Sequence, residues 1–264
     1  MMIAMFFQLC ARTEAAAAEC KGRRACKFCL QPPCAGESTL ESHMQLSLVE
    51  MMSQITDVLE HFKVKECLGL GVGTGAYLLA LHAATFSAKS PFVGLILISP
   101  CCKKSGWWEW MSGSWTASRL EKFGWSKGTK NHFIQRLFAP ATTQVLGGDS
   151  DLMKAFRRNI QGIDPKGVAH YLRACVGRSD IRGLLHNIPC RVLLVYGSQA
   201  MYQSDCLELA SSVNKSKFAL VEIDRAGVLV NEERPMDLLS PFQLFLTALQ
   251  LEGYGLGLSL EVGQ

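Results

Sequence analysis

The chain has 264 residues, of which 48% are hydrophobic and 19% charged, and its formal net charge at pH 7 is +4. This balance is typical of a globular chain with an apolar core, and the length allows one α/β domain or two small ones. Lysines and arginines are scattered along the sequence rather than gathered in one stripe, which argues against a nucleic-acid-binding protein.

The cysteines indicate a reducing compartment, so we expect a cytoplasmic protein. Their number, eleven, is odd and their spacing is irregular, which argues against the disulfide framework of a secreted domain. Four thiols near the start could together bind zinc, namely Cys20, Cys26, Cys29 and Cys34. Their outer spacings match no familiar zinc finger, so we favour a disordered leader over residues 1–37 and keep the metal site as the alternative.

No stretch of the sequence is suited to cross a membrane. Residues 1–9 are mostly apolar, but they are too few to span a bilayer and lack the basic start of a signal peptide. No other continuous apolar run reaches the length of about 18 residues that a spanning helix needs. We therefore predict neither a transmembrane helix nor a signal peptide.

A glycine-rich turn organises the rest of the chain. Apolar residues recur every three or four positions over residues 38–62, which predicts an amphipathic helix. Residues 67–80 then pass from a short apolar run through alternate glycines into a helix-like run, and residues 92–99 form the next strand-like run. Strand, sharp turn, helix and strand predict a βαβ unit and a parallel sheet.

This turn has the form of a catalytic elbow without its nucleophile. Gly71-x-Gly73-x-Gly75 matches the pattern G-x-S-x-G of α/β-hydrolases, with glycine in place of serine. The stretch from Gly71 to Ala76 also fits the dinucleotide-binding pattern G-x-G-x-x-G/A. That pattern expects an acidic residue about twenty positions on, and the next strand ends in residues 98–103 without one. A nucleotide-binding module therefore stays as an alternative.

The other two members of a hydrolase triad are absent as well. In α/β-hydrolases the acid and the histidine follow later strands, in that order along the chain. The acid is expected about three residues after the glycine that ends its strand. Here the strand-like run at residues 190–196 ends at Gly197, which places the acid at Ala200. Counting back from the turn at residues 233–235 places the histidine at Val228, and no histidine occurs beyond that point. With Gly73 at the elbow, all three catalytic positions are vacated, which leaves no nucleophile, orienting acid or general base.

Residues 101–187 separate two predicted strands and contain predicted helices, one that begins at Ser150 and one that begins at Asp164, where proline follows the capping residue. Because insertions of this kind usually form a lid, we expect a helical cap there. The segment holds all five tryptophans, which we interpret as packing within the cap rather than as a ligand cage. The sheet resumes at residues 190–196, followed by a helix (204–213), a strand (218–223) and a last amphipathic helix (238–251).

Several sequence blocks in this order resemble the NDR (N-myc downstream-regulated) family, most of all its plant members, the N-myc downregulated-like and pollen SF-type proteins. The resemblance covers roughly residues 38–255. Its blocks are residues 69–77, 93–100, 104–110, 178–181, 190–197 and 232–235. The resemblance implies a non-catalytic α/β-hydrolase fold, in agreement with the vacated triad. It also implies signalling through protein contacts, with the heterotrimeric G-protein βγ dimer as a partner and a part in auxin transport, and it implies no cofactor.

The start of the chain departs from that family. Family members have well over a hundred residues before the elbow, and about 65 precede it here. We therefore expect a shortened isoform or an alternative gene model, with a partial α/β-hydrolase fold over residues 38–264, a mostly parallel sheet and its first strands missing. The strand at Cys67–Leu70 would then be an exposed edge. We expect no enzyme activity, and a divergent hydrolase with a non-standard site stays as an alternative.

Overall fold

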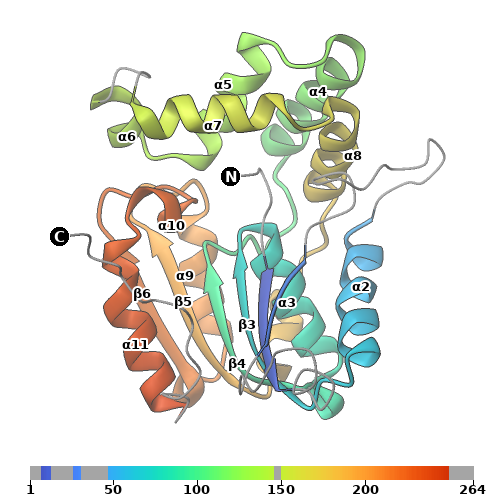
Figure 1. Ribbon diagram of the computed structural model, residues 1–264, viewed down its shortest axis with the longest axis vertical. Coiled ribbons are helices and arrows are strands. Elements are labelled where there is room, and N and C mark those ends of the chain that lie inside the picture. The colour runs from blue at the N-terminus through green and yellow to red at the C-terminus, as the bar shows by residue number, and fades with distance from the viewer. Residues whose placement is uncertain (1–6, 13–25, 31–46, 146–149, 250–264) are drawn as a thin grey trace.

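One six-stranded sheet runs through the described part of the chain, and a helical cap lies over one end of it (Figure 1). The computed structural model describes residues 7–12, 26–30, 47–145 and 150–249. The strands are β1 (Phe7–Arg12), β2 (Cys26–Leu30), β3 (Glu66–Val72), β4 (Phe92–Ile98), β5 (Arg191–Gly197) and β6 (Phe218–Ile223). They lie in the order β2-β1-β3-β4-β5-β6, and β3 to β6 run parallel to one another.

The strand that leads into the elbow is not an edge, so that prediction is wrong. β1 pairs antiparallel with β3 from Phe7 opposite Gly71 to Arg12 opposite Glu66, and β2 pairs with the other side of β1. An uncovered β3 would have left a row of backbone N–H and C=O groups without partners. Residues 1–37, expected to be disordered, supply both covering strands, and their other residues lie outside the described ranges.

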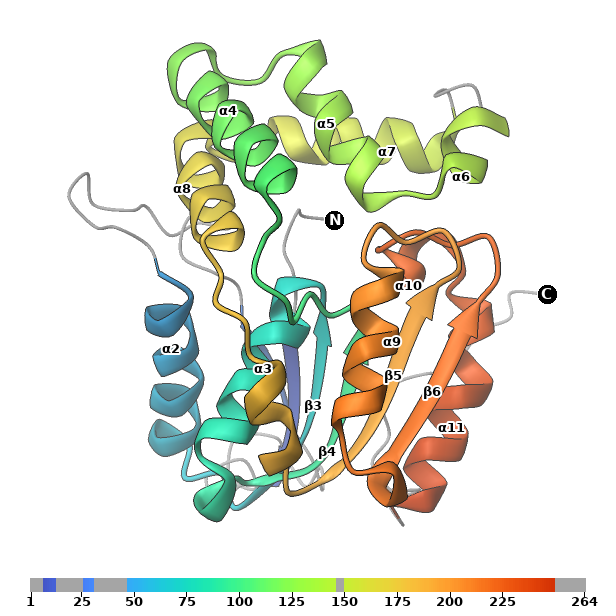
Figure 2. The same ribbon diagram turned by 180° about the vertical axis from the view of Figure 1, so that it is seen from behind.

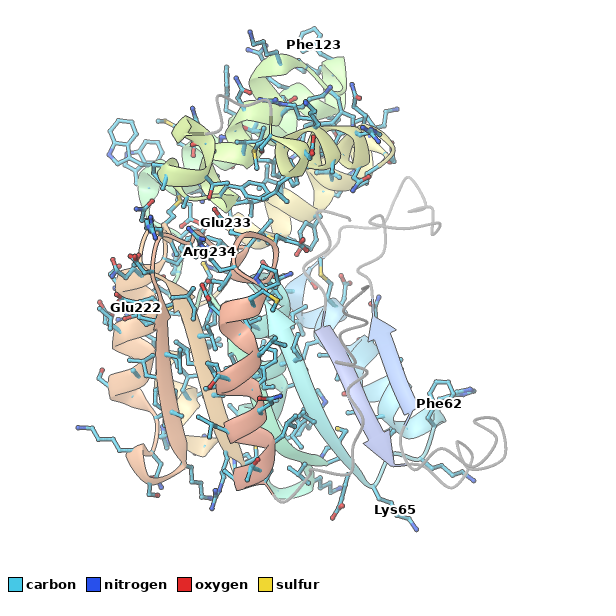
Figure 3. The ribbon with its side chains drawn as sticks, turned by 60° about the vertical axis from the view of Figure 1, so that its left-hand side comes forward. Phe62, Lys65, Phe123, Glu222, Glu233 and Arg234 are labelled. Atoms are coloured by element: carbon cyan, nitrogen blue, oxygen red, sulfur yellow. The ribbon has the colours of Figure 1, made fainter. Side chains whose placement is uncertain are left out.

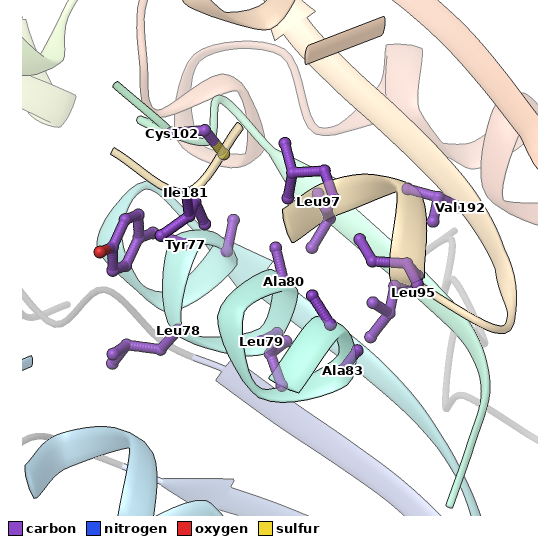
Figure 4. Packing of buried hydrophobic residues seen from close by; sticks show 14 of the residues in the cluster. Tyr77, Leu78, Leu79, Ala80, Ala83, Leu95, Leu97, Cys102, Ile181 and Val192 are labelled. Atoms are coloured by element: carbon purple, nitrogen blue, oxygen red, sulfur yellow. The ribbon is translucent and has the colours of Figure 1, made fainter. Parts of the chain in front are cut away.

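Helices cover both faces of the sheet (Figures 1 and 2). On one face lie α2 (Leu48–His61), α3 (Thr74–Thr85) and α9 (Gln203–Ser212), and on the other lies α11 (Leu239–Ala248). Because side chains alternate along a strand, β4 contributes side chains to the apolar clusters on both faces of the sheet. Leu95 and Leu97 pack against α3 (Figure 4), whereas Ile96 and Ile98 pack with the α11 side.

The segment between β4 and β5 forms the cap. It contains α4 (Trp107–Phe123), α5 (Lys127–Leu137), α6 (Pro140–Val145), α7 (Asp151–Gln161) and α8 (Pro165–Val176). Ser126, Ser150 and Asp164 begin α5, α7 and α8 by accepting hydrogen bonds from backbone N–H groups of the first turn. The predicted starts at Ser150 and Asp164 are therefore confirmed. The cap has its own apolar core, which includes Leu120 and Phe156.

Only one tryptophan packs as the sequence predicted. Trp125 lies against the cap core and donates its indole N–H to the carbonyl oxygen of Ile163 at 2.9 Å. The other four side chains are exposed, so the interpretation as cap packing is wrong for them: Trp107, Trp108, Trp110 and Trp115.

Short elements complete the described chain. They are η1 (Ser87–Lys89), η2 (Arg182–Asn187), η3 (Lys215–Lys217), α10 (Val230–Glu233) and η4 (Met236–Leu238). None of the described helices combines the length and the apolar character that crossing a bilayer requires.

A buried histidine links α2 to α3 and makes the fold sensitive to acid. His82 on α3 is 3% exposed, and its Nε2 lies 3.1 Å from Oγ1 of Thr56 on α2. Its Nδ1 has no hydrogen-bond partner among the described residues. Burial disfavours the charged imidazolium and lowers the pKa of His82 from 6.5 to about 4.

We therefore expect stability to fall as the pH drops from 6.5 to 4. In that range the unfolded chain binds a proton at residue 82 and the folded chain does not, so the loss approaches about 1.4 kcal/mol per pH unit. Above pH 6.5 the histidine is neutral in both the folded and the unfolded chain, so its titration no longer changes the free energy of unfolding. Urea unfolding at several pH values checks this, with His82→Gln as the comparison. An unchanged pH slope in the variant would contradict the assignment.

Candidate functional site

The elbow predicted from the glycine pattern is present. β3 ends at Val72, α3 begins at Thr74, and Gly73 between them has φ 57° and ψ −116°. A side chain is strained in this backbone conformation, and glycine adopts it freely. Gly71 allows the strand and helix to approach, because a Cβ there would lie 2.6 Å from the backbone nitrogen of Ala76. The backbone thus forms a tight strand-to-helix turn with no nucleophile at its tip.

The structure brings the three vacated positions to one region. Gly73 and Val228 line the same cavity, which lies between the elbow and the cap. Ala200 is buried in the apolar cluster that also contains Val228. These three residues come from the loops that follow β3, β5 and β6, which is where an α/β-hydrolase carries its nucleophile, acid and histidine.

Hydrogen bonds fix the loop that carries Val228 to the cap, and Glu233 of the turn at residues 233–235 takes part in them. The backbone N–H groups of Val228 and Leu229 both donate to the carbonyl oxygen of Leu137, at 2.9 and 3.1 Å. The Glu233 carboxylate accepts from the backbone N–H of Gly227 at 2.6 Å and from that of Ala139 at 2.9 Å. Figure 3 places Glu233 where the body meets the cap. The turn therefore holds body and cap together.

The cavity at the elbow is small. Its volume is about 60 Å³, which holds a few water molecules, whereas pockets for small-molecule ligands usually measure roughly 300–1,000 Å³. Apolar side chains make much of its wall, including Phe133, Leu137, Leu172, Val176 and Val228. A space of this size has no room for a dinucleotide, which weighs against the nucleotide-binding alternative.

A polar network at the wall of the cavity joins the cap to the body, and we call it the Glu109 network. Arg178 donates two hydrogen bonds to the Glu109 carboxylate, at 2.9 and 2.8 Å. Arg136 and the hydroxyl of Tyr202 each donate to the same carboxylate at 2.8 Å. Glu109 and Arg136 belong to α4 and α5, and Tyr202 precedes α9. No sequence pattern predicted this network, although Glu109 and Arg178 lie in two of the blocks that resemble the NDR family.

Glu109 is held as a carboxylate and is not available as a base. Burial by itself would raise its pKa, but the hydrogen bonds from Arg178 and Tyr202 and the charges of Arg178 and Arg136 together outweigh burial, so the pKa lies below its usual value. Arg178 is only 6% exposed. A general base must accept a proton near neutral pH, and a carboxylate bound by two guanidinium groups is poorly suited to do so.

Hydroxyl and thiol groups also line the cavity. The hydroxyl of Thr74 lies 3.3 Å from Sγ of Cys175. Burial raises the pKa of the Cys175 thiol, and likewise that of Cys101, so both stay protonated. No histidine lines the cavity in the described part of the chain. Asp205, the one acid near the predicted triad position, lies on α9 with its carboxylate 3.7 Å from Nζ of Lys103.

The predicted metal alternative falls largely outside the described residues. Cys20 and Cys34 are not among them, and Cys26 and Cys29 belong to β2. Within the residues that are described, no three or more histidine, cysteine or acidic side chains gather so that they could hold a metal ion.

Solved structures share this fold. A thermophilic esterase from Thermogutta terrifontis superimposes with a TM-score of 0.73 at 18% identity, over 91% of this chain and 86% of the esterase. MGS-M2, an α/β hydrolase from a deep-sea metagenome library, gives a TM-score of 0.67 at 13% identity, over 90% of this chain and 85% of that enzyme. At these identities the likeness establishes the α/β-hydrolase fold and nothing about activity.

Several known proteins are similar to this chain in sequence. Protein NDL1 of Arabidopsis thaliana is 32% identical over 80% of this chain and 59% of its own length. Pollen-specific protein SF21 of Helianthus annuus is 30% identical, over 80% of this chain and 58% of its own length. An NDRG-like protein of Dictyostelium discoideum is 28% identical, over 79% and 63%. The chain thus spans about three-fifths of the length of the curated relatives it matches.

The match to a family extends further towards the start of the chain than the sequence blocks suggested. The sequence model of the Ndr family covers residues 18–256, whereas the resemblance was expected to begin near residue 38. That range includes the elbow, the cap, the cavity and all three vacated catalytic positions. This protein therefore belongs to the Ndr family.

Proposed function

We propose that this chain is a non-catalytic member of the α/β-hydrolase fold that acts in signalling through contacts with other proteins. One observation carries the proposal. Of the three loops that position nucleophile, acid and histidine in a hydrolase, two bring Gly73 and Val228 to one cavity, and the third brings Ala200 into the apolar cluster that contains Val228. None of these side chains can attack a carbonyl carbon or move a proton.

The surroundings of the cavity support the same proposal. Acyl transfer requires a nucleophile with an adjacent base. Among the described groups that line the cavity, the thiols are buried and protonated, and the Glu109 carboxylate is occupied by Arg178 and Arg136. The two arginines and Tyr202 serve to connect the cap to the body. A divergent hydrolase would need a base that these contacts leave unoccupied.

Restoring the nucleophile alone is not expected to restore hydrolysis. Gly73→Ser would place a hydroxyl at the elbow, with Ala200 and Val228 still unable to activate it. Serine at φ 57° should lower the free energy of unfolding by about 1–3 kcal/mol. Urea unfolding checks the stability, and release of p-nitrophenol from a short ester checks the activity. Ester turnover by this single variant would show that another group serves as the base.

The partner class comes from the family. We propose the heterotrimeric G-protein βγ dimer as a partner, a part in the regulation of auxin transport, and a cytoplasmic location. The six cysteines from residue 67 onwards are all buried free thiols, which suits a reducing compartment. The relatives named above are longer than this chain, so partner binding is proposed for the part of the family fold that this chain contains.

Binding to the βγ dimer can be measured directly. Purified chain is immobilised and titrated with purified plant βγ dimer, with the esterase of the same fold as the matched control. We expect saturable binding to this chain and none to the esterase. Equal binding signals on the immobilised chain and on the immobilised esterase, or no saturable signal on either, would contradict the proposed partner. Neither result bears on the absence of catalysis, which the ester assay tests separately.

A further inference from the structure

Helix α4 presents a large aromatic surface to solvent. Its outward side carries Trp107, Trp108, Trp110, Met111 and Trp115, with exposed fractions of 63%, 74%, 49%, 37% and 61%. We call these five residues the tryptophan face. Trp107 and Trp108 stack with ring centroids 6.5 Å apart, and Trp107 and Trp110 lie 5.8 Å apart. Contiguous exposed apolar surface of this kind usually marks an interaction site.

The tryptophan face is not needed to attach α4 to the cap. The buried side of α4 consists of small and medium residues, Gly113, Thr116, Ala117 and Leu120. A Cβ at Gly113 would lie 2.5 Å from a methyl group of Val176, so this helix packs closely against α8. Amphipathic helices normally turn their largest apolar side chains inwards. Here the largest ones point outwards, which indicates that something outside the described fold covers them.

The charge around the tryptophan face is positive. Lys104 and Lys122 are exposed, and the guanidinium carbon of Arg119 lies 4.7 Å above the Trp115 ring. The two acids of α4 are already paired: Glu109 with Arg178 and Arg136, and Glu121 with Arg173 at 2.6 Å. The surface therefore offers aromatic rings and cations, with its carboxylates neutralised by partners within the protein.

We propose that the tryptophan face docks on an anionic lipid bilayer, with α4 lying in the plane of the interface. Indole rings favour the boundary between headgroups and acyl chains, and helices with tryptophan beside lysine and arginine bind there. The cations would contact anionic headgroups. The end of α4 carries Phe123, 75% exposed, at the extremity of the cap (Figure 3).

A hollow beside the tryptophan face suits a lipid headgroup. It has a volume of about 340 Å³ and is lined by Lys104, Ser105, Trp107 and Trp110 with the turn after α8. An ammonium and a hydroxyl are groups that bind a phosphate. The proposal does not depend on the proposed signalling partner, because it rests on the exposed residues of α4 and on the hollow beside them.

Vesicle binding of the full chain tests the proposal. The probes are vesicles of phosphatidylcholine alone and of phosphatidylcholine with phosphatidylserine, followed by co-sedimentation and by tryptophan fluorescence. Because four of the five tryptophans lie on α4, docking should shift the emission maximum to the blue. We expect binding to the anionic vesicles, weakened as salt is raised to about 1 M, where the Debye length falls to roughly 3 Å.

Paired variants locate the contact. Trp108→Ser with Trp115→Ser should lower vesicle affinity about tenfold or more, whereas Leu244→Ser, which replaces an equally exposed residue on α11, should not change it. Lys122→Glu should weaken binding to anionic vesicles, and Lys65→Glu, at the opposite end of the molecule in Figure 3, should leave it unchanged. Thermal melts confirm that each variant is folded.

Three results would overturn the proposal. The first is no binding of the wild-type chain to anionic vesicles, and the second is equal affinity of the tryptophan double variant. The third is a concentration-dependent dimer that the double variant abolishes, with no vesicle binding, which would assign the tryptophan face to a second copy of the chain.

Discussion

Replacing Arg178 with methionine is expected to lower the free energy of unfolding by about 3–5 kcal/mol. The guanidinium is buried and provides two of the hydrogen bonds to Glu109, so its loss removes the main counter-charge of a half-buried carboxylate. It also donates to the carbonyl oxygens of Lys103 and Cys175, at 2.6 and 3.2 Å, and both would lose that donor. Urea unfolding followed by circular dichroism measures the loss.

The chain offers a matched control for this variant. Arg182 also makes ion pairs, with Asp180 and Glu208, but its side chain is 39% exposed. Exposed ion pairs contribute little because water screens them, so Arg182→Met should cost far less than Arg178→Met. Glu109→Gln combined with Arg178→Met should recover part of the loss, since a neutral amide in place of the carboxylate no longer needs the counter-charge of Arg178. Equal losses for the two arginine variants would contradict the central place of the Glu109 network.

Gly71→Ala is expected to cost about 3 kcal/mol or more, or to prevent folding. A Cβ at this position would lie 2.6 Å from the nitrogen of Ala76 and 2.6 Å from the carbonyl carbon of Gly75. Both atoms belong to the backbone of the elbow, so no change of rotamer relieves the overlap. The strand and the helix would have to separate, and the βαβ unit at the centre of the fold would be disrupted.

Two other glycines make this prediction specific. A Cβ at Gly183 meets nothing within 4 Å, so Gly183→Ala should change stability by less than about 0.5 kcal/mol. A Cβ at Gly94 would meet Cδ1 of Leu249 at 2.6 Å, and a flexible side chain can move, so Gly94→Ala should fall between the two. Chemical denaturation of all three variants gives the order. A Gly71→Ala protein as stable as Gly183→Ala would show that the turn is not tight.

The body of the fold could be predicted from the sequence because its signals are local. Alternating glycines, apolar runs of strand length and helix starts at Ser150 and Asp164 each depend on neighbouring residues. The counting rules that located Ala200 and Val228 also depend on local landmarks, namely Gly197 and the turn around Glu233. The structure places Val228 at the same cavity as Gly73 of the elbow, and Ala200 in the apolar cluster that contains Val228.

Features that depend on distant parts of the chain were missed. The pairing of β1 with β3 joins residues about sixty positions apart, and no local pattern specifies which strand covers an edge. The Glu109 network likewise gathers residues from α4, α5, the turn after α8 and the start of α9. The exposure of the tryptophans was missed because residue type favours burial. Contacts with other helices, such as the packing of Gly113 against Val176, show that α4 turns its small residues inwards.

Ester hydrolysis by the purified chain is the most direct test of the claim that this α/β-hydrolase fold has no catalytic site. A panel of p-nitrophenyl esters of different acyl lengths is assayed with the wild-type chain, and the esterase of the same fold serves as the positive control. We predict rates equal to the buffer background for every ester. Turnover well above background that persists through further purification, and that falls when Thr74 or Cys175 at the cavity is replaced by valine, would contradict the account.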